Sequence, residues 1–247
     1  MSASSSKLSA SRGLSILPAL FRTSVGQKLL TALTGVALVG FIVMHLLGNL
    51  TLLAPDAGPF NLYAHKLDSL GPLKILAEVG LVALFGLHIL NGILLKLDHK
   101  RARPVSYGYA PKSKGGPSYS NASSRNMIVS GSILLFFLIL HIVQFRFGPS
   151  LSEGYTTLLD GGVEARDLHR LIVETFSNPA MVAIYVGTTL FLGSHVRHGF
   201  WSMFQSLGLM KQSRSRALYA AGLVVGLVLA VGFLALPIVL YFRSQGV

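Results

Sequence analysis

Five long apolar stretches, separated by polar connections, constrain this chain more than any other feature of its sequence. A helix needs about 20 mostly apolar residues to cross the hydrocarbon core of a bilayer. The stretches that meet this requirement cover residues 28–53, 73–97, 126–147, 179–204 and 217–242. No connection between them is long enough for a separate soluble domain. The sequence therefore predicts an all-α integral membrane bundle of five transmembrane helices.

The composition agrees with a membrane location and argues against a soluble one. Charged residues make up only 12% of the 247 residues, whereas soluble domains carry about 25%. The net charge of +12 would suit a nucleic-acid partner only on a broad water-facing surface, for which too few polar residues are left. The sequence has no cysteine, which excludes disulfides, iron–sulfur clusters and thiolate zinc sites held by this chain alone.

The Lys and Arg residues are distributed unequally between the two ends of the predicted helices. The N-terminal segment and the connections 96–125 and 197–216 together hold 15 of the 21 basic residues but one of the nine acidic residues. Basic connections stay on the cytoplasmic side of a membrane. We therefore predict a cytoplasmic N-terminus and an outer C-terminus. Residues 1–27 form a cytoplasmic or interfacial segment in this interpretation, and residues 28–247 form the membrane domain.

Four of the eight histidines lie deep within the predicted spans, one in each of the first four, while His198 lies one turn nearer the inner end of the fourth. Ionisable groups inside a bilayer are costly and rare. With a rise of about 1.5 Å per residue, His45 and His141 lie about 22–25 Å above the inner ends of their helices, and His88 and His195 about 13 Å. The sequence therefore predicts an outer pair, His45 with His141, and an inner pair, His88 with His195.

Two stacked histidine pairs are typical of a membrane cytochrome with two b-type haems. Neutral imidazole is an axial ligand of haem iron, and bundle cores hold such cofactors. Without a Cys-x-x-Cys-His motif, covalent attachment is excluded. A flat macrocycle needs small residues near its ligands, and we expect Gly48, Gly92 and Gly199 to serve, because they follow three of the histidines by three or four residues. Phe145 takes the equivalent place after His141. A non-haem zinc or iron site fits less well, because no acidic or thiol ligand lies near these pairs.

Polar residues near the outer ends form a candidate quinone and proton site. Glu78 lies about one turn inside the outer boundary of the second span, and Tyr63 and His65 lie in the connection before it. Such a carboxylate can move protons or hydrogen-bond a quinone. It can equally be a carboxylate that only complements the N-terminal end of its helix.

The inner ends carry a second candidate quinone site and candidate partners for haem propionates. Buried propionates need cationic or hydroxyl partners. The quinone candidates are Ser24, Lys28 and Trp201, and the propionate candidates are Arg22, Arg197 and His198. The alternative interpretation is that the cations anchor the cytoplasmic side and that the tryptophan belongs to an interfacial aromatic belt.

Two segments resemble a known family. TSVGQKLLTALTGVALVGFIVMHLLGNL (23–50) and SHVRHGFWSMFQSLG (194–208) are similar to the single-chain, five-helix, diheme cytochrome b anchor of succinate:quinone oxidoreductases. This is the type found in bacterial succinate dehydrogenases and fumarate reductases that use menaquinone. The resemblance covers nearly the whole chain in length, helix number and histidine placement. It implies axial ligands at the four membrane histidines, and it favours His195 over His198 in the fourth helix.

This resemblance implies the membrane half of a respiratory enzyme in the bacterial cytoplasmic membrane, surrounded by lipid. A flavoprotein would oxidise succinate, and an iron–sulfur subunit on the cytoplasmic face would deliver the electrons to this chain. Two haems b would pass the electrons to a quinone, menaquinone in this type, at a site on this chain. The sequence has no Gly-rich fingerprint for binding FAD itself. A trimer is compatible with the sequence, but nothing in the sequence supports it.

Two other functions stay open at this point. The first is a diheme b subunit of another respiratory oxidoreductase, such as a nitrate reductase or a formate dehydrogenase. The second belongs to a different class, a small transporter that uses the histidines as a proton relay. No nucleic-acid partner is expected in any of these cases.

Overall fold

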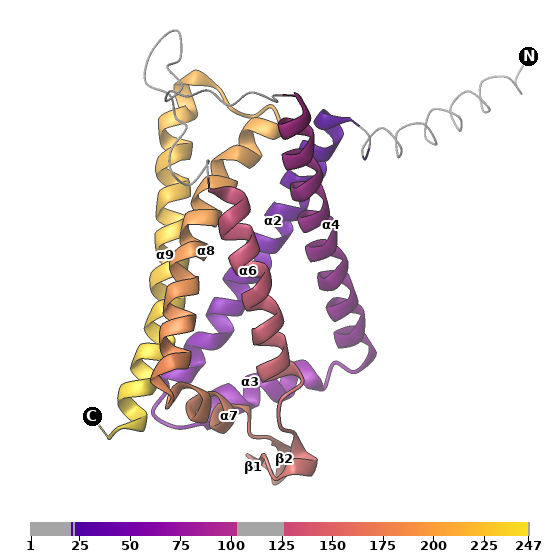
Figure 1. Cartoon of the computed structure of the whole chain (residues 1–247). Coiled ribbons are helices and arrows are strands. Elements are labelled where there is room, and N and C mark those ends of the chain that lie inside the picture. The colour runs from indigo at the N-terminus through magenta and orange to yellow at the C-terminus, as the bar shows by residue number, and fades with distance from the viewer. Residues whose placement is uncertain (1–20, 22, 103–125, 247) are drawn as a thin grey trace, which may run out of the picture.

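The computed structural model describes residues 21, 23–102 and 126–246, and its five long helices form one bundle (Figure 1). Each of the five is long and apolar enough to cross a membrane. They are α2 (Ser24–Asn49), α4 (Pro72–Ala102), α6 (Met127–His141), α8 (Pro179–Ser206) and α9 (Gln212–Ser244). The predicted all-α membrane bundle of five helices is therefore confirmed.

Successive long helices run in opposite directions, so one end of the bundle holds the start of α2 and the ends of α4 and α8 (Figure 1). We call this the N-terminal end of the bundle and the other the C-terminal end. The alternation agrees with the order assumed in the charge argument. The assignment of the N-terminal end to the cytoplasm remains a prediction.

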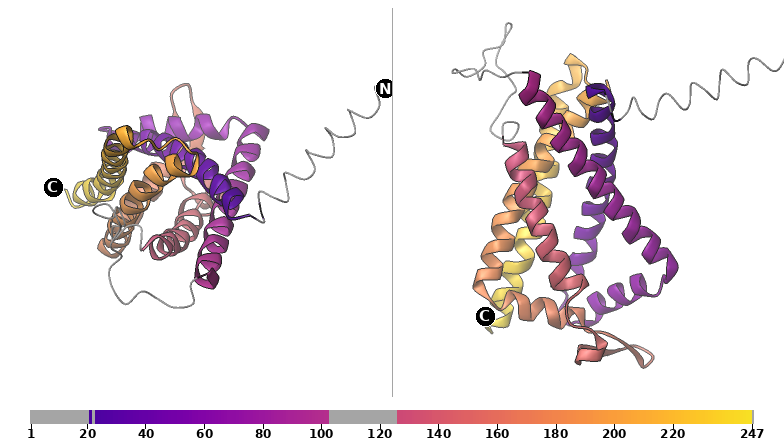
Figure 2. Two further views of the ribbon diagram at one scale, coloured as in Figure 1. Left: turned by 90° about the horizontal axis from the view of Figure 1, so that it is seen from above. Right: turned by 45° about the vertical axis from the view of Figure 1, so that its right-hand side comes forward.

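Short elements cover the C-terminal end of the bundle. Two of them, α3 (Gly58–Asp68) and α7 (Leu168–Phe176), lie across it (Figure 1). The others are η1 (Leu50–Leu53), η2 (Ile142–Arg146), η3 (Leu151–Glu153) and the antiparallel hairpin of β1 (Thr156–Leu159) and β2 (Val163–Arg166). The sequence did not predict α3 or the hairpin, because both are short and flanked by polar residues. In Figure 2, α3 bridges the gap where α4 leans away from α2.

One buried amide ties α3 to α7. The side chain of Asn61 is only 1% exposed. Its Nδ2 donates to Asp167 Oδ1 at 2.8 Å, and its Oδ1 accepts from the His169 backbone N–H at 2.9 Å. The Asp167 carboxylate also caps α7 by accepting from the Arg170 backbone N–H. Because both amide groups and the cap are satisfied together, this cluster fixes the cover over the C-terminal end.

The most extensive contact between long helices is that of α8 with α9, and small residues make it close. A Cβ added to Gly193 of α8 would lie 2.8 Å from Ala230 Cβ and 2.8 Å from Gly226 O. A Cβ on Gly226 would lie 2.6 Å from Gly193 O, and one on Gly222 would lie 2.9 Å from Arg197 O. Without a hydrophobic force between helices in lipid, such close backbone packing is what holds membrane helices together.

Candidate functional site

The structure places the four membrane histidines in two pairs across the bundle. The rings of His45 on α2 and His141 on α6 have centroids 5.7 Å apart, with their planes at 89°. The rings of His88 on α4 and His195 on α8 have centroids 6.4 Å apart, with planes at 65°. These are the pairings that helix depth predicts, and all four side chains are half-buried within the protein.

The spacing of each pair suits one metal ion bound between two imidazoles. A metal–imidazole bond is about 2 Å long, so two rings on opposite sides of one ion have centroids roughly 6 Å apart. In the described part of the chain, no three His, Asp or Glu side chains converge as a metal site. Each pair therefore supplies only two ligands. This donor set fits haem iron, whose four remaining ligands come from the macrocycle.

The two pairs stand above one another along the same faces of two helices. Thr34 of α2 contacts the His88 ring, and Ser130 of α6 contacts the His195 ring. Each of these hydroxyl residues precedes the histidine of its own helix by 11 residues. Eleven residues make about three turns and rise about 16 Å. The pairs are therefore separated by about 16 Å along α2. This is more than the difference of roughly 10 Å between the histidine depths predicted from the inner ends of the helices.

Aromatic rings surround the His45–His141 pair. Phe41 stacks on His45 at 5.5 Å and Phe137 on His141 at 5.8 Å between centroids. Phe145, expected in place of a small residue, lies 5.3 Å from the His141 ring in an edge-on arrangement. These rings give the His45–His141 pair an apolar environment.

The glycines beside the rings are different from those that the sequence suggested. Gly35 and Gly131 are the glycines at the rings, since a Cβ on either would lie 3.5 Å from Cε1 of His88 or His195. Gly48 leaves no room for a macrocycle, because the Tyr63 ring of α3 already fills the space beside it and would collide with an added Cβ. A Cβ on the other two predicted glycines, Gly92 and Gly199, would meet no atom within 4 Å, so both positions remain open on their helices. The error for Gly48 arose because α3 was not foreseen.

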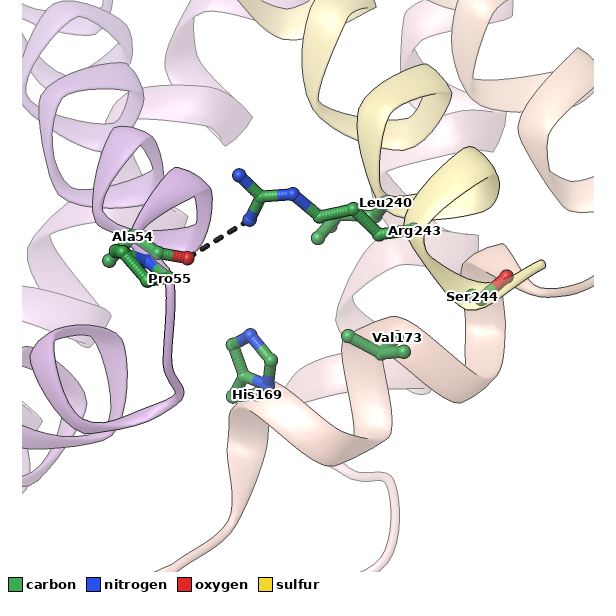
Figure 3. Close-up of a pocket in the computed structure, with 7 residues that line it drawn as sticks. All are labelled: Ala54, Pro55, His169, Val173, Leu240, Arg243 and Ser244. Carbon is green, nitrogen blue, oxygen red and sulfur yellow. Dashed lines mark hydrogen bonds between the residues drawn. The ribbon is translucent and has the colours of Figure 1, made fainter. Parts of the chain in front are cut away.

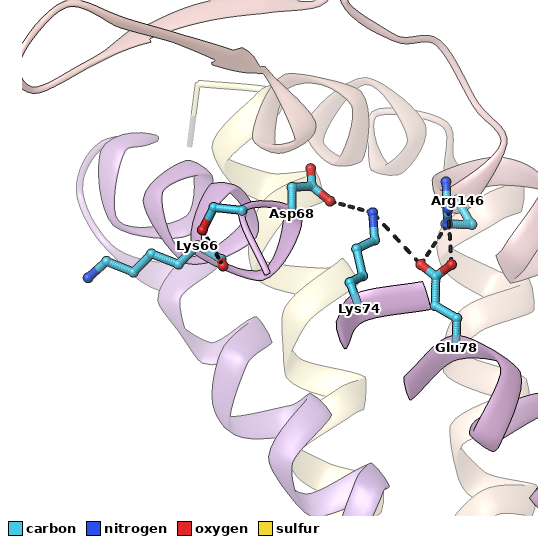
Figure 4. A network of polar contacts seen from close by, with 6 residues as sticks. Lys66, Asp68, Lys74, Glu78 and Arg146 are labelled. Carbon is cyan, nitrogen blue, oxygen red and sulfur yellow. Dashed lines mark hydrogen bonds and ion pairs between the residues drawn. The ribbon is translucent and has the colours of Figure 1, made fainter. Parts of the chain in front are cut away.

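The outer candidate site is not assembled as the sequence suggested (Figure 4). Glu78 accepts two hydrogen bonds from Arg146, at 2.9 and 3.1 Å. Lys74 lies 3.8 Å from the same carboxylate and also pairs with Asp68. Among the described residues, no hydrogen bond or ion pair joins Glu78 to the other two candidates. Those are Tyr63, which packs against Gly48, and His65, in the last turn of α3.

At the N-terminal end, the candidate residues separate into exposed and buried groups. Ser24 and Lys28 are exposed on the first turns of α2. Trp201 is buried between His198, at 4.7 Å, and Tyr219 of α9, at 4.9 Å between centroids. It therefore joins α8 to α9 rather than facing outward as a belt residue. The stem of Arg197 packs on Gly226 of α9, and Arg22 lies outside the described residues.

Three buried polar atoms near this end have no hydrogen-bond partner among the described residues. They are Gln27 Oε1, Asn91 Oδ1 and His198 Nδ1. Gln27 lies in the first turn of α2, while Asn91 and His198 each follow a paired histidine by three residues. All three therefore lie between the His88–His195 pair and the N-terminal end. Sequence reasoning missed the two amides, whose signal is a polar side chain inside an apolar span.

A cavity of about 220 Å³ opens at the C-terminal end between η1, α7 and α9 (Figure 3). Its polar lining includes His169, Arg243 and Ser244. Arg243 donates to the carbonyl oxygens of Ala54 and Leu53 at 2.9 and 2.8 Å. Partial burial lowers the pKa of His169, so this imidazole is neutral near pH 7. None of the predicted site residues lines this cavity.

Comparison with known proteins gives one informative match. The chain is 27% identical over 191 residues to the succinate dehydrogenase cytochrome b558 subunit of Bacillus subtilis (strain 168), which covers 76% of this chain and 82% of that protein. No family model matches the sequence, and no solved structure matches it. The resemblance of this multi-pass membrane chain to the cytochrome b anchor subunits of succinate dehydrogenase, indicated by its motifs, is thereby confirmed.

Proposed function

We propose that this chain is the membrane anchor and diheme cytochrome b subunit of a succinate:quinone oxidoreductase. The observation that carries the proposal is the pair of facing histidines at each of two levels, with one histidine from each of the first four long helices. The similarity to a protein named as a succinate dehydrogenase cytochrome b558 subunit supports the choice of enzyme. The flavoprotein and iron–sulfur subunits would dock on the cytoplasmic face.

In this proposal, His45 and His141 hold one haem b, and His88 and His195 hold the other. Haem iron held by two imidazoles supplies one-electron transfer. Phe41 stacks on the His45 ring.

The quinone, menaquinone by the family resemblance, has two candidate places on this chain. At the C-terminal end, Glu78 would have to leave Arg146 before it could take or give a proton. At the N-terminal end, the acceptors Gln27 Oε1 and Asn91 Oδ1 have no donor within the described part of the chain, and a quinol hydroxyl or a water molecule would satisfy them. Activity of Glu78→Gln and Asn91→Leu enzymes with a soluble quinone would decide between the two ends.

The experiment that tests the proposal is a reduced-minus-oxidised spectrum of the purified complex, with haem content measured in single histidine variants. His45→Ala and His141→Ala should remove the same haem, and His88→Ala and His195→Ala the other. His198→Ala should keep both haems. Absence of b-type absorption in the wild-type protein would refute the proposal and favour a proton-coupled transporter.

Purification in mild detergent separates the proposal from its nearest alternative. We expect flavin and iron–sulfur subunits to co-purify with this chain and to confer succinate-dependent reduction of its haems. Co-purification with a molybdenum enzyme would instead identify the b subunit of another respiratory oxidoreductase.

A further inference from the structure

Two hydroxyl residues face the His88–His195 pair from the neighbouring helices. Thr34 Oγ1 lies 3.2 Å from His88 Nδ1, and Ser130 Oγ lies 3.1 Å from His195 Nδ1. Thr34 and Ser130 are both buried, 5% and 4% exposed. In each case the contact joins residues far apart in the sequence, by 54 and 65 positions.

The hydrogen bonds of the hydroxyl groups decide which atom carries the shared proton. Thr34 Oγ1 lies 2.7 Å from the Leu30 carbonyl oxygen, which can only accept, so the hydroxyl proton is used there. The Thr34 oxygen is then left as an acceptor, and His88 Nδ1 must be the donor. Ser130 follows the same pattern. Its hydroxyl donates to the Met127 carbonyl oxygen at 3.1 Å, and its oxygen is left to accept from His195 Nδ1. In this arrangement both imidazoles carry the ring proton on Nδ1 and leave a lone pair free on Nε2.

The arrangement is repeated in the sequence. Thr34-Gly35 precedes His45 on α2 by the same spacing with which Ser130-Gly131 precedes His141 on α6, a Ser/Thr-Gly-x9-His pattern. In both copies the hydroxyl contacts a ring on another helix, and the following glycine lies against Cε1 of that ring. Because 11 residues make about three turns, each of these helices presents a ligand at one level and a hydroxyl at the other on a single face.

We propose that Thr34 and Ser130 are positioning residues for the metal ligands His88 and His195. Each hydroxyl oxygen accepts a hydrogen bond from the Nδ1–H group of its histidine and so directs Nε2 toward the iron. This inference rests on the proposed function. A partner that accepts a hydrogen bond from the N–H group on the other side of a ligating imidazole fixes the ring orientation and makes the ligand more basic. More basic ligands stabilise oxidised iron, so these hydroxyls lower the potential of this haem and increase its affinity.

The His45–His141 pair has weaker partners of this kind. Asn49 Nδ2 lies 3.4 Å from the His45 ring nitrogens, and Tyr185 Oη lies 3.5 Å from His141 Nδ1 while donating to Gln144 at 2.6 Å. Removing the hydroxyls at the other level should therefore affect only one of the two haems. This selectivity separates a positioning role from a general loss of packing.

The test uses Thr34→Val, which keeps the shape of the side chain, and Thr34→Ser, which keeps the hydroxyl. The matched control is Thr188→Val, because Thr188 is a buried threonine of α8 whose hydroxyl donates to the Ile184 carbonyl. Potentiometric titration of the full complex reports each haem separately. Haem transfer to apomyoglobin measures retention, and Ser130→Ala with Ser130→Thr repeats the comparison on the second hydroxyl.

We expect Thr34→Val to raise the midpoint potential of the His88–His195 haem and to weaken its retention about tenfold or more. The other haem should not change, and Thr34→Ser and Thr188→Val should resemble the wild type. Loss of this haem in Thr34→Val with recovery in Thr34→Ser would equally support the inference. Unchanged haem in Thr34→Val, an equal defect in Thr34→Ser, or an equal defect in Thr188→Val would overturn it. A wild-type complex without b haem would instead refute the proposed function itself.

Discussion

Replacing Gly226 by alanine tests whether the close contact of α8 with α9 holds the His195 ring in place beside His88. The added Cβ would lie 2.6 Å from Gly193 O, where ordinary contact begins at 3.4 Å. The obstacle is backbone rather than a flexible side chain, so the helices must separate by about 0.8 Å. His195 is only two residues from Gly193, and the displacement therefore shifts this ring relative to His88.

The energetic cost follows from that separation. A gap of about 0.5–1 Å forfeits a quarter to a half of the attraction between packed atoms. Overpacking of this kind typically costs about 1–3 kcal/mol, and packing is the main force between membrane helices. We therefore expect Gly226→Ala to lower the midpoint of thermal unfolding and to release the haem proposed between His88 and His195 before the one proposed between His45 and His141.

The assay is thermal unfolding in mild detergent, followed by haem absorption and by tryptophan fluorescence. Gly187→Ala is the matched control, because a Cβ on this α8 glycine would meet no atom within 4 Å. This control should be neutral or slightly stabilising, since alanine is the better helix former. Equal midpoints and equal haem content in the two variants would show that the α8–α9 contact is not tight and would refute the reasoning.

Three further predictions concern the C-terminal end of the bundle. Asn61→Ala should cost about 1–3 kcal/mol because the His169 backbone N–H loses its acceptor and the Asp167 carboxylate loses one of its donors. Limited proteolysis should then cut near α7 faster than in the wild type. Burial lowers the pKa of His169 in the folded protein, so the unfolded chain binds more protons at this residue. Stability should therefore fall as the pH decreases through about 6.5. Between about pH 7.5 and 5.5, the melting midpoint of His169→Gln should fall less than that of the wild type. Glu78→Gln should change stability by less than about 1 kcal/mol, because its ion pair with Arg146 is partly exposed, and a larger loss in chemical unfolding would show that the pair is desolvated in the membrane.

Local signals were sufficient for the helices and for the pairing of the membrane histidines. Pro72 and Pro179 begin α4 and α8, as expected for residues that lack a backbone N–H. The depth of each histidine along its own helix was enough to predict which rings face each other, because consecutive spans must cross the same slab. The prediction failed for Gly48, whose neighbour Tyr63 comes from a helix that a short, weakly apolar segment did not reveal.

The sequence alone was enough to predict five spans long and apolar enough to cross a membrane, with a histidine deep within each of the first four. These properties depend on the composition and length of single segments, since the cost of placing a residue in lipid depends little on its distant neighbours. Only the tertiary structure decided that Thr34 contacts His88, that Ser130 contacts His195 and that Glu78 pairs with Arg146. Helices that are apolar on every face carry little periodic signal for their rotation about the axis. Rotation is set by close packing between helices, and it decides which polar groups meet inside the bundle.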